Sequence, residues 1–191
     1  TGRAAAAAGD VNGDGRDDVI VGARIAGNNS RSSSGSAYVI FGQAGNAKLD
    51  LLSLTPTEGF RIDGALANEQ LGEDVAGAGD VNGDGLDDLL LSSSNSDRNS
   101  RTNSGSVYVI FGRTLNTSID LAALSSIQGY RIDGAVAGDQ LGKSIAGAGD
   151  VDSDGMDDMI ISATGAGFNS RTSSGSVYVV FGEVAPSGID L

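Results

Sequence analysis

The stretch Asp80-Val81-Asn82-Gly83-Asp84-Gly85-Leu86-Asp87-Asp88 carries the strongest structural signal in the chain. Counted from Asp80, oxygen-bearing side chains occupy positions 1, 3, 5 and 9, and a glycine occupies position 6. Alternate spacing on a tight turn aims these oxygens at one centre, and the glycine permits the positive-φ bend that turns the next carbonyl inward. Ca²⁺ takes about six to eight oxygen ligands, whereas Mg²⁺ requires a stricter octahedron with more water. The stretch therefore predicts a calcium-binding loop.

This loop occurs three times at a spacing of 70 residues, beginning at Asp10, Asp80 and Asp150. Other landmarks keep the same spacing, among them a Phe-Gly pair at 41–42, 111–112 and 181–182. In-phase copies with no insertion between them indicate one structural module repeated in tandem. We therefore divide the chain into three units, residues 1–70, 71–140 and 141–191.

Each unit contains short segments typical of β-strands. In the second unit they lie at 71–79, 88–92, 106–112 and 129–134, and the acidic loop joins the first to the second. Branched aliphatic and aromatic residues favour strands, and the 30 glycines of the chain disfavour helices. Four strands per unit predict an all-β protein made of β-propeller blades, each a four-stranded antiparallel sheet. The third unit contains no copy of the fourth strand, so the last blade is expected to lack it.

Composition excludes several functions. The chain has no Cys and no His, which removes thiolate and imidazole catalysis and Cys/His zinc sites. Its 25 acidic residues against 12 basic ones give a net charge of −13, which makes nucleic acid and anionic membranes poor partners. No apolar run approaches the roughly 20 residues that cross a bilayer, so we expect no membrane insertion.

The acidic loop differs from the loop of an EF-hand, which shares its opening but requires Glu at position 12. That position holds Val21, Leu91 and Ile161, each inside an expected strand. Thirteen of the 25 acidic residues fall in the three loops, and packing them without a cation would cost on the order of several kcal/mol of repulsion. A metal-free acidic turn is therefore the less favoured interpretation.

The segment Leu71-Gly72-x-x-Val75-Ala76-Gly77-x-Gly79 before the loop, and Tyr108-Val109-Ile110-Phe111-Gly112 after it, resemble the FG-GAP repeat of integrin α-subunit β-propellers and their bacterial relatives. The resemblance covers nearly the whole chain. It implies three Ca²⁺ ions, one per repeat, each bound by the side chains at positions 1, 3, 5 and 9 and the carbonyl at position 7. The implied ligands are Asp10, Asn12, Asp14, Arg16 and Asp18; Asp80, Asn82, Asp84, Leu86 and Asp88; and Asp150, Asp152, Asp154, Met156 and Asp158. The aspartate at position 8 (Asp17, Asp87 and Asp157) is not usually a ligand in such repeats.

The same resemblance implies a noncatalytic adhesion or recognition module, extracellular or at the cell surface, with a protein or glycan ligand. No unique cluster breaks the repeat symmetry, as an active site would. A lectin is the main alternative, although the chain has few aromatic residues to stack on sugars. A calcium-dependent enzyme acting on polysaccharides is a further alternative, but no acid–base pair is evident.

Two further expectations concern loops and assembly. Arg31, Arg101 and Arg171 recur in Ser/Asn-rich loops, where we expect them to order the loop rather than face a ligand. Known propellers close with roughly four to eight blades, so three blades leave two apolar faces uncovered. The chain is therefore expected either to form a homodimer that completes a six-bladed ring or to be part of a longer chain.

Overall fold

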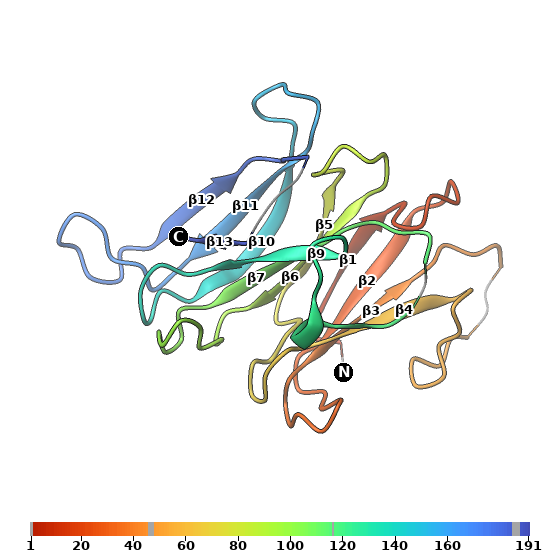
Figure 1. The fold of residues 1–191 in the computed structure, drawn as a ribbon, viewed down its shortest axis with the longest axis horizontal. Helices are drawn as coiled ribbons and strands as arrows, with labels where there is room; N and C mark the ends of the chain where they lie inside the picture. The colour runs from red at the N-terminus through yellow and green to blue at the C-terminus, as the bar shows by residue number, and fades with distance from the viewer. Residues whose placement is uncertain (1, 46–47, 116, 185–187) are drawn as a thin grey trace.

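The protein is an all-β structure of three sheets that lie side by side, as Figure 1 shows. The computed structural model describes residues 2–45, 48–115, 117–184 and 188–191. Sheet 1 has the order β1-β2-β3-β4-β8, sheet 2 the order β5-β6-β7-β9-β13, and sheet 3 the order β10-β11-β12. Sheet 1 consists of β1 (Ala4–Gly9), β2 (Asp18–Ala23), β3 (Ser36–Ile40), β4 (Gly59–Asp63) and β8 (Ile119–Asp120). Sheet 2 consists of β5 (Val75–Gly79), β6 (Asp88–Ser93), β7 (Ser106–Ile110), β9 (Gly129–Asp133) and β13 (Ile189–Asp190), and sheet 3 of β10 (Leu141–Gly149), β11 (Asp158–Ala163) and β12 (Ser176–Val180).

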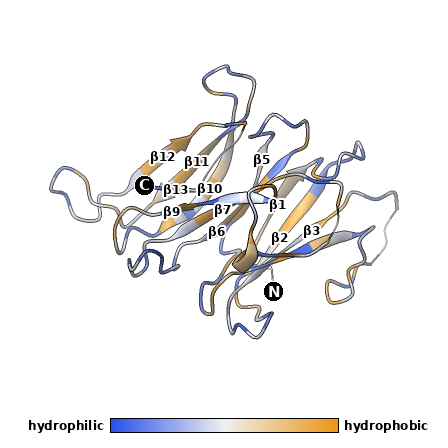
Figure 2. Cartoon of the chain, in the orientation of Figure 1, coloured by the Kyte–Doolittle hydropathy of each residue, from blue (hydrophilic) through white to orange (hydrophobic). Residues whose placement is uncertain are grey.

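The predicted strands are present, and consecutive strands of each unit pair antiparallel. The register repeats between units: Val21 pairs with Tyr38 in sheet 1, and Leu91 pairs with Tyr108 in sheet 2. Figure 2 shows the hydrophobic residues mostly on strands such as β2 and β12. Among the described residues the only helical segment is a short 3-10 turn, η1 (Leu121–Ala123), and no helix is long and apolar enough to span a membrane.

Sheets 1 and 2 each contain a fifth strand that the sequence analysis did not predict. β8 pairs in parallel with β4, and β13 pairs in parallel with β9. Each fifth strand comes from the following unit, so the boundaries at residues 70 and 140 do not coincide with the boundaries between sheets. A strand of two residues is too short to show the alternation by which strands are recognised. Sheet 3 contains three strands among the residues that the structure describes.

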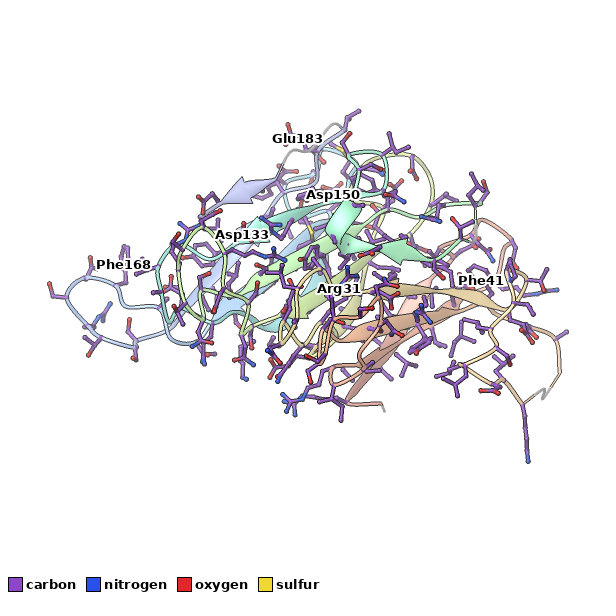
Figure 3. All side chains as sticks on the ribbon, turned by 60° about the horizontal axis from the view of Figure 1, so that its bottom comes forward. Arg31, Phe41, Asp133, Asp150, Phe168 and Glu183 are labelled. Carbon is purple, nitrogen blue, oxygen red and sulfur yellow. The ribbon has the colours of Figure 1, made fainter. Side chains whose placement is uncertain are left out.

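Arginines of the Ser/Asn-rich loops hold these fifth strands. Arg31 Nη2 donates to Asp120 Oδ1 of β8 at 2.5 Å, and Asn29 Nδ2 donates to Oδ2 of the same carboxylate at 3.0 Å. Arg101 makes the equivalent contact with Asp190 of β13. These two arginines therefore order structure, as expected. Arg171 lies on the loop of sheet 3 that extends away from the sheets at Phe168 (Figure 3), where its Nε donates to the Phe168 carbonyl at 3.4 Å.

The sheets pack face to face through alternate residues of their strands. In sheet 2, Leu89 and Leu91 belong to the core shared with sheet 1, whereas Leu90 belongs to the core shared with sheet 3. Glycine permits the close approach of β5 to β1, because a Cβ on Gly77 would lie 2.9 Å from the carbonyl oxygen of Ala7. The repeated Ala-Gly segment before each acidic loop thus serves packing between sheets.

A buried carboxylate links the three units near the first strand of each. Glu73 Oε1 accepts from Lys143 Nζ at 2.8 Å and from Arg3 Nη2 at 3.5 Å, and Oε2 accepts from Ser94 Oγ at 2.5 Å. Residues 3, 73 and 143 occupy the same position in their units, so one acid lies between two bases. Burial raises the pKa of Glu73, but the hydrogen bonds from Lys143 and Ser94 outweigh it, and the pKa lies below its ordinary value.

We predict that Glu73→Gln destabilises the fold by about 1 kcal/mol at neutral pH, a value reduced by the partial exposure of both bases. A carboxylate with a lowered folded-state pKa stabilises above its unfolded-state pKa and loses this contribution as the pH falls through the folded-state pKa. The difference between parent and variant should therefore shrink below about pH 4.5. Urea unfolding of parent and variant at pH 7 and at pH 3.5 measures this difference in stability. A difference that grows on acidification would contradict the lowered pKa of Glu73.

Candidate calcium loops

The three acidic loops share a set of hydrogen bonds from backbone amides to aspartate side chains, and each loop connects the first two strands of its unit. In loop 1, Asp10 Oδ1 accepts from the amide of Asp14 at 2.9 Å, and Oδ2 accepts from the amide of Gly15 at 2.8 Å. Gly15 has a φ of 83°, a conformation that a residue with a Cβ rarely adopts. The position-1 carboxylate therefore orders the turn that surrounds it. The same bonds recur from Asp80 to Asp84 and Gly85 in loop 2, and from Asp150 to Asp154 and Gly155 in loop 3.

The position-9 aspartate is the buried member of each loop. In loop 2, Asp88 Oδ2 accepts from the amide of Val81 at 3.0 Å, and Oδ1 accepts from the amide of Gly112 at 2.7 Å. Gly112 belongs to the Phe-Gly landmark, so that landmark fixes the last acidic side chain of the loop. Burial raises the pKa of Asp88 to about 7, against the lowering effect of these two amides, and the carboxylates of Asp84 and Asp80 raise it further. Asp18 and Asp158 accept from the corresponding amides in their units.

The side chains of loop 3 converge closely enough to share one cation. Asp150, Asp152 and Asp158 each offer a carboxylate oxygen, and the three oxygens lie within 4.8 Å of one another. Slight desolvation raises the pKa of Asp152, and the nearby carboxylate of Asp154 raises it further. A cluster of carboxylate oxygens is what a hard divalent cation binds, and its charge relieves their mutual repulsion, so the donor set fits Ca²⁺.

All the predicted ligand residues lie in these three turns. The position-3 side chains are oriented by the position-5 amide, which donates to Asn12 and Asn82 at 2.9 Å and to Asp152 at 3.2 Å. The position-5 carboxylates in turn accept from the position-7 amides of Arg16, Leu86 and Met156 at 2.9–3.0 Å. These bonds hold the residue whose carbonyl is the predicted ligand, through the peptide that precedes it.

Two of the position-8 aspartates have a structural role that the sequence analysis did not assign. Asp87 and Asp157 each reach the preceding loop, where they accept from the amides of Asp10 and Asp80. The only signal in the sequence is that all three loops carry an acidic residue at this position.

A cavity of about 580 Å³ lies apart from the loops, between η1, β9 and β13. Its lining includes Arg131 and Asp133, which bind each other through Arg131 Nε and Asp133 Oδ1 at 2.7 Å. Hydrogen bonds from Arg131 and Ser106 lower the pKa of Asp133 although burial opposes them. A carboxylate kept ionised by a neighbouring guanidinium is a poor general acid or base at neutral pH.

Comparison with known proteins agrees with this geometry. The profile of the FG-GAP repeat family matches residues 1–40, 71–110 and 142–180, so each match includes one acidic loop and the strands on either side of it. The chain is also 28% identical over 197 aligned positions to integrin alpha pat-2 of Caenorhabditis elegans. That alignment covers 93% of this chain and 14% of the relative, so the chain is similar to a small part of a much longer protein. These three matches include more than half of the residues of the chain, and one match falls in each of the three units. The chain therefore belongs to the FG-GAP repeat family.

Proposed function

We propose that this chain is a calcium-stabilised, noncatalytic recognition module of the integrin α type, acting in adhesion outside the cell or at its surface. The observation that carries the proposal is the equivalence of the three acidic loops, each with a position-1 carboxylate held by two amides and a buried position-9 carboxylate. An active site would normally break such equivalence, and the loops differ at only one predicted side-chain ligand position, where Asp152 stands in place of Asn12 and Asn82. The integrin relative supports an adhesive role.

Calorimetry tests the metal part of the proposal, with three Ca²⁺ bound per chain as the expected stoichiometry. Pull-down and glycan-array experiments in calcium and in EDTA test the recognition part, and a ligand retained only in calcium supports it. A measurable turnover with no ligand found in calcium would contradict it.

The third loop should bind Ca²⁺ at least as tightly as the others. Asp152 stands where the other loops have Asn12 and Asn82, so one more negative charge surrounds the cation, and ligand charge raises affinity. Calorimetry on Asp152→Asn is expected to show one weakened site and two unchanged ones. Three unchanged sites would mean that ligand charge does not set affinity here.

We further propose that a second copy of the chain covers the open face of sheet 3, completing a six-bladed propeller. Val177 and Val179 of β12 are 67% and 46% exposed, whereas Val107 and Val109, at the same positions of sheet 2, are completely buried against sheet 3. The face of sheet 1 that points away from sheet 2 exposes Val19, whose counterpart Leu89 is buried. The two open faces thus correspond to the two surfaces that pack against each other wherever neighbouring sheets meet inside the chain. Further blades of a longer chain are the alternative occupant.

Light scattering measures this assembly directly. We expect a mass of about 38 kDa in calcium, twice the 19.1 kDa of one chain. Val179→Glu places a charge on the open face and should give the mass of one chain, while Val136→Glu, at an exposed position outside the strands, should leave the dimer intact. A parent chain of 19.1 kDa at high concentration would contradict the dimer.

A further inference from the structure

Asp87 lies in loop 2 but holds the first residue of loop 1. Its Oδ2 accepts from the amide of Asp10 at 2.6 Å, and its own amide donates to the carbonyl of Asp10 at 3.3 Å. Both backbone groups of Asp10 are therefore engaged by one residue of the next unit. Asp157 holds Asp80 in the same way, through bonds of 3.0 Å and 2.9 Å.

The loops also touch through their position-7 side chains. A Cβ on Gly13 would lie 2.9 Å from Leu86 Cδ2, and a Cβ on Gly83 would lie 3.6 Å from Met156 Cγ. The backbone after the Phe-Gly pair of the second unit also reaches loop 1, because the amide of Arg113 donates to the carbonyl of Val11 at 2.8 Å. Neighbouring loops thus form a continuous seam rather than separate turns.

The position of Asp87 ties this seam to both predicted metal sites. Asp87 stands between Leu86, whose carbonyl is a predicted ligand, and Asp88, the buried ligand of loop 2. At its other end the contact fixes Asp10, whose carboxylate is a predicted ligand of loop 1. A shift of either loop on losing its cation would therefore be transmitted to the other through one residue.

We infer that Asp87 and Asp157 are positioning residues that couple calcium binding in neighbouring loops. The inference rests on the proposed calcium function and goes beyond it, because it assigns a role to an acidic residue that is not itself a ligand. Outer hydrogen bonds that orient metal ligands typically change metal affinity by about tenfold to a hundredfold when removed.

Three glycine amides make it possible to follow each loop separately. Gly15, Gly85 and Gly155 each donate to the position-1 carboxylate of their own loop, at 2.8 Å, 2.8 Å and 3.0 Å. Their amide resonances in a calcium titration followed by ¹⁵N NMR should report the midpoint for loops 1, 2 and 3 respectively.

The central comparison is between Asp87→Ala and Asp87→Asn. Both variants remove the same charge, but only asparagine keeps a side-chain oxygen that accepts from the amide of Asp10. In Asp87→Ala we expect the midpoint at Gly15 to rise about tenfold, with Gly155 unchanged. In Asp87→Asn the midpoint at Gly15 should stay close to that of the parent. Equal midpoints at Gly15 in the two variants would overturn the inference.

A second pair of variants tests the contact from the side of loop 1. A Cβ on Gly9 would overlap the carboxylate of Asp87, whereas a Cβ on Gly138 would meet no atom within 4 Å. Both glycines have positive φ, 71° and 87°, so alanine strains the backbone similarly at each. Gly9→Ala should raise the midpoint at Gly15, and Gly138→Ala should not; equal effects would count against the inference.

Coupling itself is tested by disabling loop 2. With Asp84→Ala, we expect a higher midpoint at Gly15 in the parent background and no further increase in the Asp87→Ala background; strict additivity would overturn the coupling.

Hydrogen exchange of the Asp10 amide in metal-free protein should quicken in Asp87→Ala and not in Asp87→Asn. A parent that binds no calcium contradicts the proposed function, whereas a parent that binds calcium with the Gly15 midpoint unaffected by Asp87→Ala contradicts the inference alone.

Discussion

Removing calcium is expected to lower the melting temperature of this protein by roughly 15 °C or more. Ligand that binds only the folded chain stabilises it by RT ln(1 + [L]/Kd), about 2.7 kcal/mol per site at a hundredfold excess over Kd. With three sites this amounts to about 8 kcal/mol, and each kcal/mol shifts the melting temperature of a chain of this size by about 2–4 °C. The metal-free loops carry, in addition, the repulsion of their clustered carboxylates.

The measurement is a thermal unfolding scan in calcium, in EGTA with excess Mg²⁺, and after calcium is restored. Magnesium should not replace calcium, because it requires a smaller octahedron and keeps more of its water. An unchanged melting temperature in EGTA would rule out calcium as a structural ion of this fold.

Glu69→Ala is expected to cost about 3–5 kcal/mol of folding free energy, because it leaves a largely buried guanidinium without the carboxylate that balances its charge. Glu69 Oε1 accepts from Arg98 Nη2 and from the hydroxyl of Tyr108, both at 2.6 Å, and Oε2 accepts from the amide of Leu66 at 2.8 Å. The side chain of Glu69 is fully buried and that of Arg98 is 12% exposed. Burial, and then the charge of Glu69, raise the pKa of Tyr108, so its hydroxyl stays protonated and donates.

The chain contains a matched control for this prediction. Asp139 stands at the position of Glu69 in the next unit and accepts from the amide of Val136 at 2.9 Å, but Phe168 replaces the arginine. Asp139→Ala therefore strands no buried charge and should cost only about 1 kcal/mol. Urea unfolding compares the two variants, and equal costs would mean that the Glu69–Arg98 pair adds nothing beyond a turn hydrogen bond.

The sequence predicted the features that repeat and missed those that join one unit to the next. The strands and the loops follow from local patterns, such as oxygen donors at alternate positions around Gly85, and these patterns hold wherever the unit lies. The parallel pairing of β8 with β4 depends on two residues of the following unit, and nothing near Ile119 in the sequence identifies its partner.

The role of Asp87 escaped prediction for the same reason. Its spacing within loop 2 suggests only a further acid, and its partner Asp10 lies in another unit. Glu69 and Arg98 are also far apart in the sequence, and the pair breaks the repeat rather than following it. Predicting contacts between units therefore requires knowing how the sheets are arranged, and the sequence periodicity does not give that arrangement.

The fifth strands have a consequence for how such a chain can change in length. Because β8 and β13 occupy equivalent positions in successive units, a deletion or duplication of 70 residues at any phase leaves each sheet that is followed by another unit with an equivalent donor strand. Unequal recombination between copies of the gene would then yield arrays of different length whose internal joints are all complete. The 70-residue unit that repeats in the sequence is offset from the sheet, which is completed by a strand of the next unit. Because of this offset, arrays of such repeats can gain or lose a unit while the contacts between neighbouring sheets stay complete.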